Sequence, residues 1–475
     1  MNNITNPTVI VGGGFVGLFT ALHLSHRHYS EPIILIDSQD RFVFKPLLYE
    51  HLTGEMQNEQ VLPRYEKLLE GSKVTFIQDK VTKIDLKQRR LELASGLHYD
   101  YRHLVLGVGS TQGYLGTEGA EENAFAFRTQ EDTIALEKHL RECLQQASQA
   151  ESAQREALLT IAIVGAGPSG VEIAATLADL LPQWYEKLGG DFSNIRIVLV
   201  NHGQEILKGD VNSHLRDTAL KALKDKAIPV ELVLGAKVTK VGRDRLEYQL
   251  ENEEATKTIS TQTVVWTAGT ANNPLLKTLS IADKNRDRHG LPMVTDTLQL
   301  PNYPEVFAAG DCAVVLDRSY PPVAQIAYQE GKTIAKNLMA LSQNKELHPV
   351  NASMRGTLMK LGIRNGVANI FDKVKVKGRA GDSIRSLTYL EMLPTPIHNF
   401  NATTEWLSDE IFHDHHHYHQ PTKLGQPKSN KRFAGLASIA AGAIAAVALV
   451  GGTAAVWHIA HSGNQPQATQ KQLTK

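Results

Sequence analysis

Residues 8–17 read TVIVGGGFVG, and this stretch decides the fold. It consists of a short β-branched strand and a G-x-G-x-x-G turn that opens an apolar helical run. A second strand pattern at 33–37 ends in Asp37, 20 residues after Gly17. In a βαβ unit of this kind the glycines let the backbone approach a pyrophosphate, the helix N-terminus attracts its charge, and the carboxylate accepts hydrogen bonds from ribose hydroxyls. The stretch therefore predicts a dinucleotide-binding site.

The same design occurs a second time in the chain. Residues 160–170 read TIAIVGAGPSG and are followed by a helical run and a strand pattern at 195–201. Strand patterns at 104–109 and 264–269 complete the first and second units, and one at 306–311 returns to the first. We therefore predict an α/β fold with two Rossmann-type dinucleotide-binding domains, one inserted into the other.

The composition resembles that of ordinary globular proteins. Apolar residues make up 42% and charged residues 21%, and Lys+Arg equals Asp+Glu at 50 each, which gives no support to nucleic acid as a partner. The two cysteines, Cys143 and Cys312, form no C-x-x-C, so we expect neither a disulfide framework nor a metal site. The N-terminus lacks a signal-peptide pattern, and we expect the body to fold in a reducing compartment.

The C-terminal part carries a candidate membrane span. Residues 434–457 are uncharged, and this run exceeds the roughly 20 residues that a helix needs to cross a bilayer. The run is rich in Ala and Gly, so a soluble Ala-rich helix is the alternative. Trp457 stands where an interfacial anchor is expected, and basic residues are denser before the run than after it. We predict one C-terminal span, with the catalytic body on the cytoplasmic face of the membrane.

The region before that span is expected to face the membrane. Its basic and apolar residues could form a surface for anionic lipid, and an ordinary half-buried helix and turn is the alternative. The residues of this expected surface are Leu358, Lys360, Leu361, Ile363, Arg364, Val367, Ile370, Phe371, Lys373, Lys375, Lys377 and Arg379. The His-rich stretch 413–419 could bind a transition metal, but a solvated linker is favoured.

The expected boundaries follow from these patterns. The first dinucleotide-binding domain comprises 1–128 and 291–345, and a connecting helix at 129–157 leads to the second domain at 158–290. The remaining parts are a membrane-facing region at 346–412, a His-rich and polar linker at 413–432, a transmembrane helix at 433–460 and a polar tail at 461–475.

Four motifs resemble those of type II NAD(P)H:quinone oxidoreductases and occur in the order found in that family. Residues 44–50 (FKPLLYE) resemble its F-x-P-L-L-Y-E segment, and 168–172 (PSGVE) resemble its G-P-[ST]-G-V-E helix start. Residues 265–269 (VWTAG) resemble its V-W-x-A-G strand, and 324–329 (AQIAYQ) resemble its A-Q-x-x-x-Q motif. The resemblance spans about 8–410. Within the family, the run LPTPIH at 393–398 and the C-terminal segment look cyanobacterial.

The resemblance implies an enzyme that passes two electrons from NADH or NADPH through FAD to a membrane quinone without pumping protons. In two-dinucleotide flavoprotein reductases a late Gly-Asp contacts the flavin, so Gly310-Asp311 implies FAD in the first domain and NAD(P)H in the second. The residues expected to bind FAD are Gly12, Gly13, Gly14, Phe15, Val16, Gly17, Asp37, Lys45, Pro46, Leu47, Val81, Gly109, Asp311, Ala324 and Gln325. Those expected to bind NAD(P)H are Gly165, Gly167, Gly170, Glu172, Asn201 and Gly269.

Three residues are implied to be catalytic. Glu172 would lie near the nicotinamide and the quinone path and act in proton transfer or positioning, although a first-turn acid can also simply stabilise its helix. Gln325 and Gln329 would lie beside the isoalloxazine ring and offer hydrogen bonds to the quinone carbonyls. The alternative for both is the polar face at the start of a helix.

The second site departs from the NADH pattern at Asn201, where an acid usually accepts from the ribose 2′-hydroxyl. An asparagine does not repel a 2′-phosphate, and a protonated His202 could assist one, so use of NADPH or of both nucleotides is expected. The alternative is that Asn201 still hydrogen-bonds the 2′-hydroxyl of NADH.

The implied partners are a plastoquinone-, ubiquinone- or menaquinone-type quinone and membrane lipid, and by analogy the protein could be a homodimer. Three other functions remain open. They are reduction of a quinone precursor in phylloquinone or menaquinone synthesis, sulfide:quinone reduction, and a membrane-tethered flavin redox sensor. Sulfide:quinone reduction needs redox cysteines facing the flavin, and the two cysteines of this chain are a poor pair.

Overall fold

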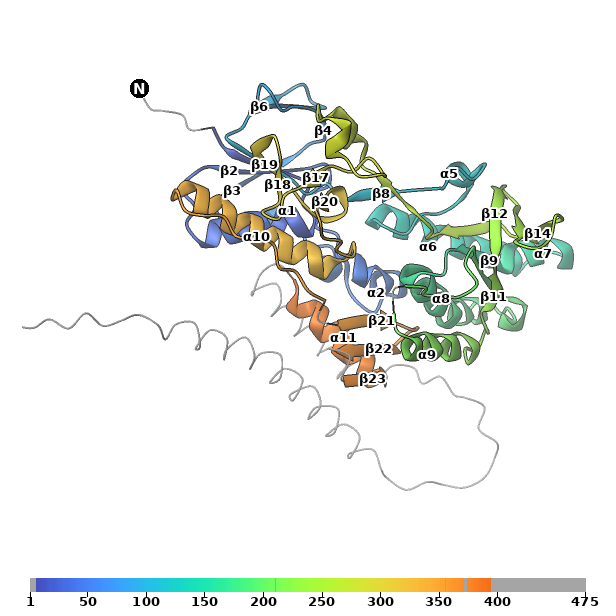
Figure 1. Cartoon of the computed structure of the whole chain (residues 1–475). Helices are drawn as coiled ribbons and strands as arrows, with labels where there is room; N and C mark the ends of the chain where they lie inside the picture. Colours follow the sequence, from blue (N-terminus) through green and yellow to red (C-terminus); the bar gives the residue numbers. More distant parts are fainter. Residues whose placement is uncertain (1–5, 210, 355, 371–373, 394–475) are drawn as a thin grey trace, which may run out of the picture.

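The computed structural model describes residues 6–209, 211–354, 356–370 and 374–393. Two sheets form the body of the molecule, and all their strand pairs are parallel except β18 with β19 at the edge of the larger one (Figure 1). The larger has the strand order β18-β19-β7-β1-β2-β3. Its strands are β1 (Thr8–Val11), β2 (Ile33–Asp37), β3 (Val74–Gln78), β7 (His103–Leu106), β18 (Gln299–Leu300) and β19 (Tyr303–Ala308). Val9 and Ile10 in its centre are fully buried, as expected where helices cover both faces of a parallel sheet.

The second sheet lies between these segments in the sequence. Its order is β11-β10-β9-β15, with β9 (Thr160–Val164), β10 (Arg196–Asn201), β11 (Glu231–Leu234) and β15 (Thr263–Trp266). The chain leaves the first sheet after β7 and returns for β18 and β19, so the second unit is inserted into the first, as predicted. Two antiparallel crossover strands, β8 (Ser110–Gln112) and β16 (Thr270–Asn272), run side by side between the units.

Eleven α-helices accompany these sheets within the described part of the chain. They are α1 (Phe15–His26), α2 (Leu48–Thr53), α3 (Asn58–Val61), α4 (Tyr65–Leu68), α5 (Ala120–Asn123), α6 (Gln130–Ala147), α7 (Ser152–Leu159), α8 (Pro168–Glu186), α9 (Ser213–Lys224), α10 (Ala324–Ser342) and α11 (Arg379–Glu391). Helix α6 begins at a capping box, in which Thr129 Oγ1 accepts from Asp132 N and Asp132 Oδ2 accepts from Thr129 N.

Three predicted strands are shorter than expected, for one shared reason. The strand patterns at 104–109, 264–269 and 306–311 were each expected to end at or next to a glycine. The structure ends each of the corresponding strands three residues earlier, and the chain then turns away at Gly109, Gly269 and Gly310, which have φ of 59°, 73° and 72°. A left-handed glycine cannot continue a strand, so these glycines mark the loops that follow the sheet edges.

Smaller sheets lie around the body. They are formed by β4 (Val81–Asp85), β5 (Arg90–Leu93) and β6 (His98–Asp100); by β12 (Ala236–Val241), β13 (Arg245–Leu250) and β14 (Thr256–Ser260); and by β17 (Met293–Val294) with β20 (Val314–Val315).

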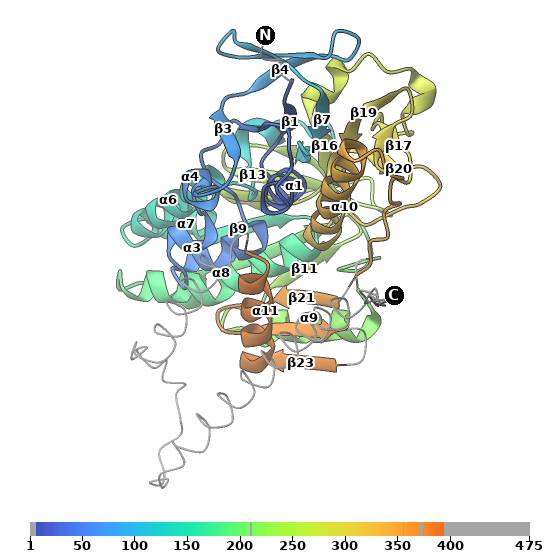
Figure 2. The same ribbon diagram turned by 90° about the vertical axis from the view of Figure 1, so that its left-hand side faces the viewer.

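The C-terminal region is an antiparallel sheet covered by one helix. Strands β21 (Gly356–Lys360), β22 (Gly366–Ile370) and β23 (Val374–Gly378) pack with α11 below α10 and next to α8 and α9 (Figures 1 and 2). The expected lipid surface is therefore wrong for Lys360, Leu361 and Val367, whose exposed fractions are 0%, 1% and 4%. The alternative of a helix and turn is also wrong, because residues 356–370 form a hairpin.

None of the helices in the described ranges combines the length and apolar character needed to cross a bilayer. The predicted span at 433–460 and the His-rich stretch at 413–419 lie outside those ranges.

Candidate functional site

The first Gly-rich turn is fixed by Asp37 and Tyr65. Asp37 Oδ2 accepts a hydrogen bond from Gly13 N at 2.6 Å, and Asp37 Oδ1 accepts one from Gln39 N at 2.8 Å. Burial raises the pKa of the Asp37 carboxyl, and the backbone N–H donors partly oppose that rise. On the other side of the turn, Tyr65 Oη donates to Gly13 O at 2.9 Å. The predicted ribose acid therefore stands beside the turn, as the fingerprint requires.

The glycines of this turn have two different roles. A Cβ on Gly17 would lie 1.9 Å from Gly12 O, and one on Gly12 would lie 2.5 Å from Gly107 O, so the fold itself needs both glycines. A Cβ on Gly14 would meet only Gly107 O, at 4.0 Å. Gly14 thus faces open space at the start of α1, where the first backbone N–H groups have no partner within the helix. This space fits a pyrophosphate.

Several polar side chains lie around Asp311, on the side of the first unit where the flavin is predicted to bind. Ser110 Oγ donates to Asp311 Oδ2 at 2.9 Å, and Arg128 Nη2 donates to Ser110 Oγ, also at 2.9 Å. Lys45 lies close enough to interact with this group, and burial and then Arg128 lower its pKa to about 8, while Asp311 acts in the opposite direction. Glu330 Oε2 accepts from Gly310 N at 2.8 Å, and burial raises the pKa of Glu330 to about 7.

The other predicted FAD residues border the same side of the first unit. Phe15, Val16 and Gly17 form the first turn of α1, and Ala324 and Gln325 begin α10, which packs along α1. Lys45, Pro46 and Leu47 form a 3-10 turn before α2, Val81 begins β4, and Gly109 follows β7.

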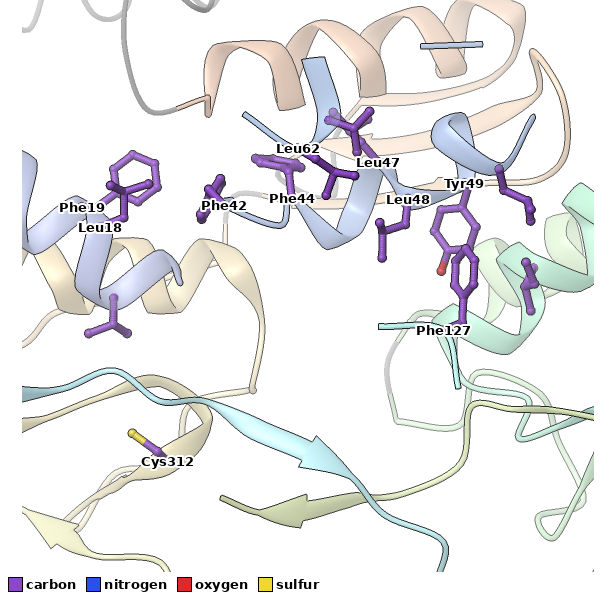
Figure 3. Packing of buried hydrophobic residues seen from close by; sticks show 14 of the residues in the cluster. Leu18, Phe19, Phe42, Phe44, Leu47, Leu48, Tyr49, Leu62, Phe127 and Cys312 are labelled. Carbon is purple, nitrogen blue, oxygen red and sulfur yellow. The ribbon is translucent and has the colours of Figure 1, made fainter. Parts of the chain in front are cut away.

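A row of apolar side chains connects this side to the C-terminal region. Phe15 packs edge-on against Phe42 and Phe44, with ring centroids 5.2 and 5.4 Å apart. Phe44 in turn contacts Tyr389 of α11 at 5.6 Å. Figure 3 shows this row continuing through the segment that carries Leu47, Leu48 and Tyr49. The FKPLLYE motif therefore forms a packed wall between the two regions.

The second Gly-rich turn repeats the first with one change. A Cβ on Gly170 would lie 1.8 Å from Gly165 O, whereas one on Gly167 would meet nothing within 4 Å. Ala166 N donates to Asn201 Oδ1 at 3.0 Å, so Asn201 occupies the place that Asp37 has in the first turn. Gly269 directly follows Ala268, whose Cα a Cβ on Gly165 would approach to 3.0 Å, and a Cβ on Gly269 itself would approach Leu115 Cδ2 to 2.9 Å.

The three predicted catalytic residues bind the backbone of strand β21 or of the segment just before it. Glu172 Oε1, on the first turns of α8, accepts a hydrogen bond from Lys360 N at 2.7 Å, at the end of the strand. At the other end, Gln325 Nε2 donates to Gly356 O at 3.1 Å, and Gln329 exchanges hydrogen bonds with the backbone of Ser353. Strand β21 therefore separates Glu172 at one end from the two glutamines at the other.

Glu172 is buried, and this burial disfavours the charged form of its carboxyl. Its exposed fraction is 9%, and burial raises the pKa of its carboxyl, while Arg385, the Lys360 N–H and the Tyr49 hydroxyl partly oppose that rise. A carboxyl with a raised pKa takes up and releases a proton at a higher pH than an ordinary glutamate.

A buried ionic cluster lies directly behind Glu172. Lys360 Nζ contacts Glu50 Oε1 at 3.1 Å and Glu55 Oε2 at 2.8 Å, and Arg385 Nη1 also donates to Glu50 Oε1. Lys360 and Arg385 are both 0% exposed. Although burial acts in the opposite direction, the two cations lower the pKa of Glu50, and Glu50 with Glu55 raises that of Lys360. The cluster therefore stays charged and attaches the C-terminal region to α2.

Sequence reasoning missed Tyr65, Ser110, Arg128, Glu330 and this ionic cluster. Glu330 directly follows the predicted Gln329, and Glu50 closes the FKPLLYE motif, so both stood next to recognised residues. No local pattern marked Lys360 or Arg385, because their partner Glu50 is more than 300 residues away.

Both cysteines are buried and free. Cys312 Sγ contacts the carbonyls of Leu106 and Ala309, and burial raises the pKa of its thiol to about 11. Cys143 lies on α6 near Thr263, at 4.0 Å between Sγ and Oγ1. Neither thiol has the low pKa that redox or nucleophilic chemistry needs.

Comparison with known proteins places this arrangement in a family. The sequence profile described as pyridine nucleotide-disulphide oxidoreductase matches residues 6–331. The chain belongs to the pyridine nucleotide-disulphide oxidoreductase family. It is 30% identical over 434 residues to the alternative NAD(P)H-ubiquinone oxidoreductase C1 of Arabidopsis thaliana. The alignment covers 84% of this chain and 80% of that protein.

Two further comparisons agree. The demethylphylloquinone reductase NdbB of Synechocystis is 32% identical over 412 residues, covering 84% of this chain and 95% of that protein. The structure of NDH2 from Plasmodium falciparum in complex with NADH matches with a TM-score of 0.76 at 16% identity, covering 86% of this chain and 99% of that one, which supports the fold. The resemblance to type II NAD(P)H:quinone oxidoreductases predicted from the motifs is thereby confirmed, and this family member is an oxidoreductase enzyme.

Proposed function

We propose that the protein transfers two electrons from NADH or NADPH to a membrane quinone of the plastoquinone, ubiquinone or menaquinone type, using FAD and without pumping protons. The observation that carries this proposal is the attachment of β21 to both nucleotide units. Gln325 lies on the helix that follows the Gly310-Asp311 loop, and Glu172 lies on the helix that opens at the second Gly-rich turn. One strand thus joins the predicted flavin side to the predicted nicotinamide side.

The first unit offers a set of groups that fits FAD. The open space at Gly14 would hold the pyrophosphate, and Asp37 would bind the ribose. The group formed by Asp311, Arg128 and Lys45 would contact the flavin end. The chemistry that FAD supplies when bound is acceptance of a hydride and release of two electrons. The Lys45 and Arg128 side chains would supply positive charge to the flavin end of a bound FAD.

Glu172, Gln325 and Gln329 are proposed to serve the quinone. A quinone needs two protons with its two electrons, and Glu172 can hold one of them because its pKa is raised. The amides of Gln325 and Gln329 stand at the start of β21 and can orient a quinone carbonyl there. Their present bonds to backbone carbonyls hold the strand that would form one wall of the quinone site.

The membrane parts of the proposal rest on the C-terminal region and its sequence. Lys375 and Lys377 are exposed on the edge strand β23, and Arg379 is exposed at the start of α11, so these three keep the role proposed for anionic lipid. The single span at 433–460, the cytoplasmic position of the body, the domain boundaries and a homodimer also remain part of this proposal.

A second candidate is reduction of a quinone precursor. It is favoured by the Synechocystis relative, which is named a demethylphylloquinone reductase and of which the match covers 95%. Sulfide:quinone reduction gains no comparable support, since Cys312 is buried with a pKa raised to about 11. Relative rates with a menaquinone-type acceptor and its demethylated precursor would separate the two candidates.

The test uses the full chain purified in detergent. We expect extraction to release FAD, either nucleotide to bleach the flavin without oxygen, and a quinone to restore the colour. Q325L should leave bleaching intact and slow reoxidation by quinone about 100-fold, because a positioned donor to a developing oxyanion is lost. Q343L, at the exposed far end of α10, is the matched control. Failure of both nucleotides to bleach the flavin would refute the proposal.

A further inference from the structure

The turn that follows β8 holds a leucine in a backbone conformation that leucine rarely adopts. Tyr114 O accepts a hydrogen bond from Thr117 N at 2.9 Å, and the two central residues of the turn, Leu115 and Gly116, have φ of 53° and 70°. Positive φ at both central positions is characteristic of a type I′ turn, in which asparagine, aspartate and glycine are favoured. Gly116 suits this turn, whereas the Cβ of Leu115 disfavours it.

The fold buries little of the Leu115 side chain. A buried leucine with positive φ would stabilise the protein through its packing in the core, but Leu115 is 73% exposed. Backbone strain that the fold itself does not need is typical of binding and catalytic sites. The strain and the exposure together therefore indicate that Leu115 contacts a ligand.

The segment before the turn is firmly held. Gly113 O accepts a hydrogen bond at 3.0 Å from Nε1 of Trp266, a side chain that is 1% exposed. Gln112 Nε2 also donates to Gly113 O at 3.0 Å, and a Cβ on Gly113 would lie 2.8 Å from the carbonyl carbon of Thr270. Leu115 is thus presented to solvent by backbone that is fixed on its N-terminal side.

Leu115 lies beside the carboxyl end of β15, close to the second Gly-rich turn. A Cβ on Gly269, three residues after that strand, would approach Leu115 Cδ2 to 2.9 Å. The preceding residue, Ala268, lies against the turn itself, because a Cβ on Gly165 would approach its Cα to 3.0 Å. Leu115 therefore contacts the same two-residue segment that contacts the Gly-rich turn.

The strand order indicates which part of a dinucleotide would reach Leu115. In a Rossmann-type unit the dinucleotide crosses the carboxyl ends of the strands, with its pyrophosphate at the Gly-rich turn and its adenosine ribose at the end of the following strand. Here the turn follows β9, and the following strand, β10, pairs with one side of β9, whereas β15 pairs with the other. The nicotinamide half would therefore extend over the end of β15 toward Leu115.

We propose that Leu115 binds the nicotinamide half of NAD(P)H through an apolar contact with the nicotinamide riboside. The side chain holds that half against Gly269, on the side from which β8 leads back to Ser110 and Asp311 at the predicted flavin site (Figure 1). A leucine supplies apolar surface that the asparagine or glycine favoured by the turn lacks. This inference rests on the proposed use of a nicotinamide dinucleotide at the second site.

The test compares ligands that contain and lack the nicotinamide half, by calorimetry on the flavin-containing full chain in detergent. L115N keeps a residue suited to the turn but removes the apolar group. It should weaken the binding of NAD⁺ about tenfold and leave that of ADP, which ends at the pyrophosphate, within about twofold. Unchanged NAD⁺ affinity in L115N, or an equal loss for NAD⁺ and ADP, would overturn the inference.

Stability gives a second readout, which should move in the opposite direction. Because asparagine adopts positive φ more readily than leucine, L115N should raise the midpoint of urea unfolding. A lowered midpoint would show that Leu115 serves the fold instead. L115M, which retains an apolar side chain, should keep the wild-type affinity for NAD⁺, and a loss equal to that of L115N would also contradict the inference.

The matched control is L97N, which changes a leucine that is 55% exposed between β5 and β6. It should alter the binding of neither NAD⁺ nor ADP. The proposed function fails separately, because it is refuted by flavin that neither nucleotide bleaches. The inference alone fails when the flavin is bleached but the wild type and L115N bind NAD⁺ equally.

Discussion

The two Gly-rich turns share one scaffold but differ in what fixes them. In the first, Asp37 accepts a hydrogen bond from Gly13 N, and the Tyr65 hydroxyl donates one to Gly13 O. In the second, Asn201 receives Ala166 N, and the backbone N–H of Leu207 takes the place of the tyrosine hydroxyl at Ala166 O. The two turns thus differ at the carbonyl, which accepts from a side-chain hydroxyl in the first turn and from a backbone N–H of the following loop in the second.

This difference suits the two ligands that we propose. A permanently bound FAD needs a turn that stays closed around it, and a buried tyrosine over the turn serves that need. An exchangeable nicotinamide nucleotide needs a site that it can enter and leave. We therefore expect the Tyr65 hydroxyl to slow the dissociation of FAD from the first turn.

The largest effect is expected from replacing, in each turn, the glycine that has no room for a Cβ. In G17A the new Cβ would lie 1.9 Å from Gly12 O, and in G170A it would lie 1.8 Å from Gly165 O, so strand and helix must separate at a cost of about 3 kcal/mol or more. G17A should yield little soluble, flavin-containing protein. G170A should purify with flavin that neither NADH nor NADPH bleaches. Flavin content and anaerobic bleaching measure both outcomes, and equal loss of flavin in the two variants would show that the units do not fold separately.

The open glycines give the next largest effect. Gly14 and Gly167 have ordinary φ of −69° and −73° and no close neighbour, so alanine fits the fold at both positions. The added methyl group occupies the proposed pyrophosphate space. G14A should weaken FAD binding at least about 1,000-fold, ~4 kcal/mol, and G167A should do the same for NAD⁺. Each variant serves as the control for the other, and unchanged affinity in its own site would refute the assigned phosphate position.

Much of the architecture was predictable because its signals are local. The β-branched strands, the glycine spacing and the helical runs at 8–37 and 160–201 all lie within short segments. The alternation in VKVKG at 374–378 also indicated a strand, but the basic residues around it were interpreted as a lipid surface. The period of two is the signal that the structure confirms, because residues 374–378 form β23.

The site was predictable only in part, because much of it depends on contacts between distant segments. Lys360 looked like a surface cation, and its burial depends on Glu50 and Glu55, which no neighbouring residue reveals. Asn201 was identified as a departure from the pattern, but its consequence depends on where its two amide hydrogens go. Hydrogen-bond direction of this kind cannot be obtained from sequence.

The stability of the first unit should depend on pH through Glu330. Burial raises the pKa of Glu330 to about 7, from the 4.5 expected in the unfolded chain. Between these values the folded protein holds a proton that the unfolded chain has lost, so the free energy of unfolding should fall by roughly 2–3 kcal/mol as pH rises from 4.5 to 7. E330Q should remove most of this slope in urea unfolding measured at pH 5 and pH 8. E156Q, an exposed carboxylate on α7, should retain it, and a slope preserved in E330Q would exclude Glu330 as its source.

The smallest expected effect concerns the brace over the first turn. Y65F removes the hydrogen bond to Gly13 O but keeps a ring that is 2% exposed and packed against Phe76. The loss should be about 1 kcal/mol, so FAD should dissociate about fivefold faster while binding of NAD⁺ stays unchanged. Y248F, on a partly buried tyrosine of the second unit, is the matched control and should alter neither. If Y65F lost flavin as completely as G14A, the hydroxyl would do more than hold Gly13 O. A direct contact between Tyr65 and the cofactor would then be required to explain the result.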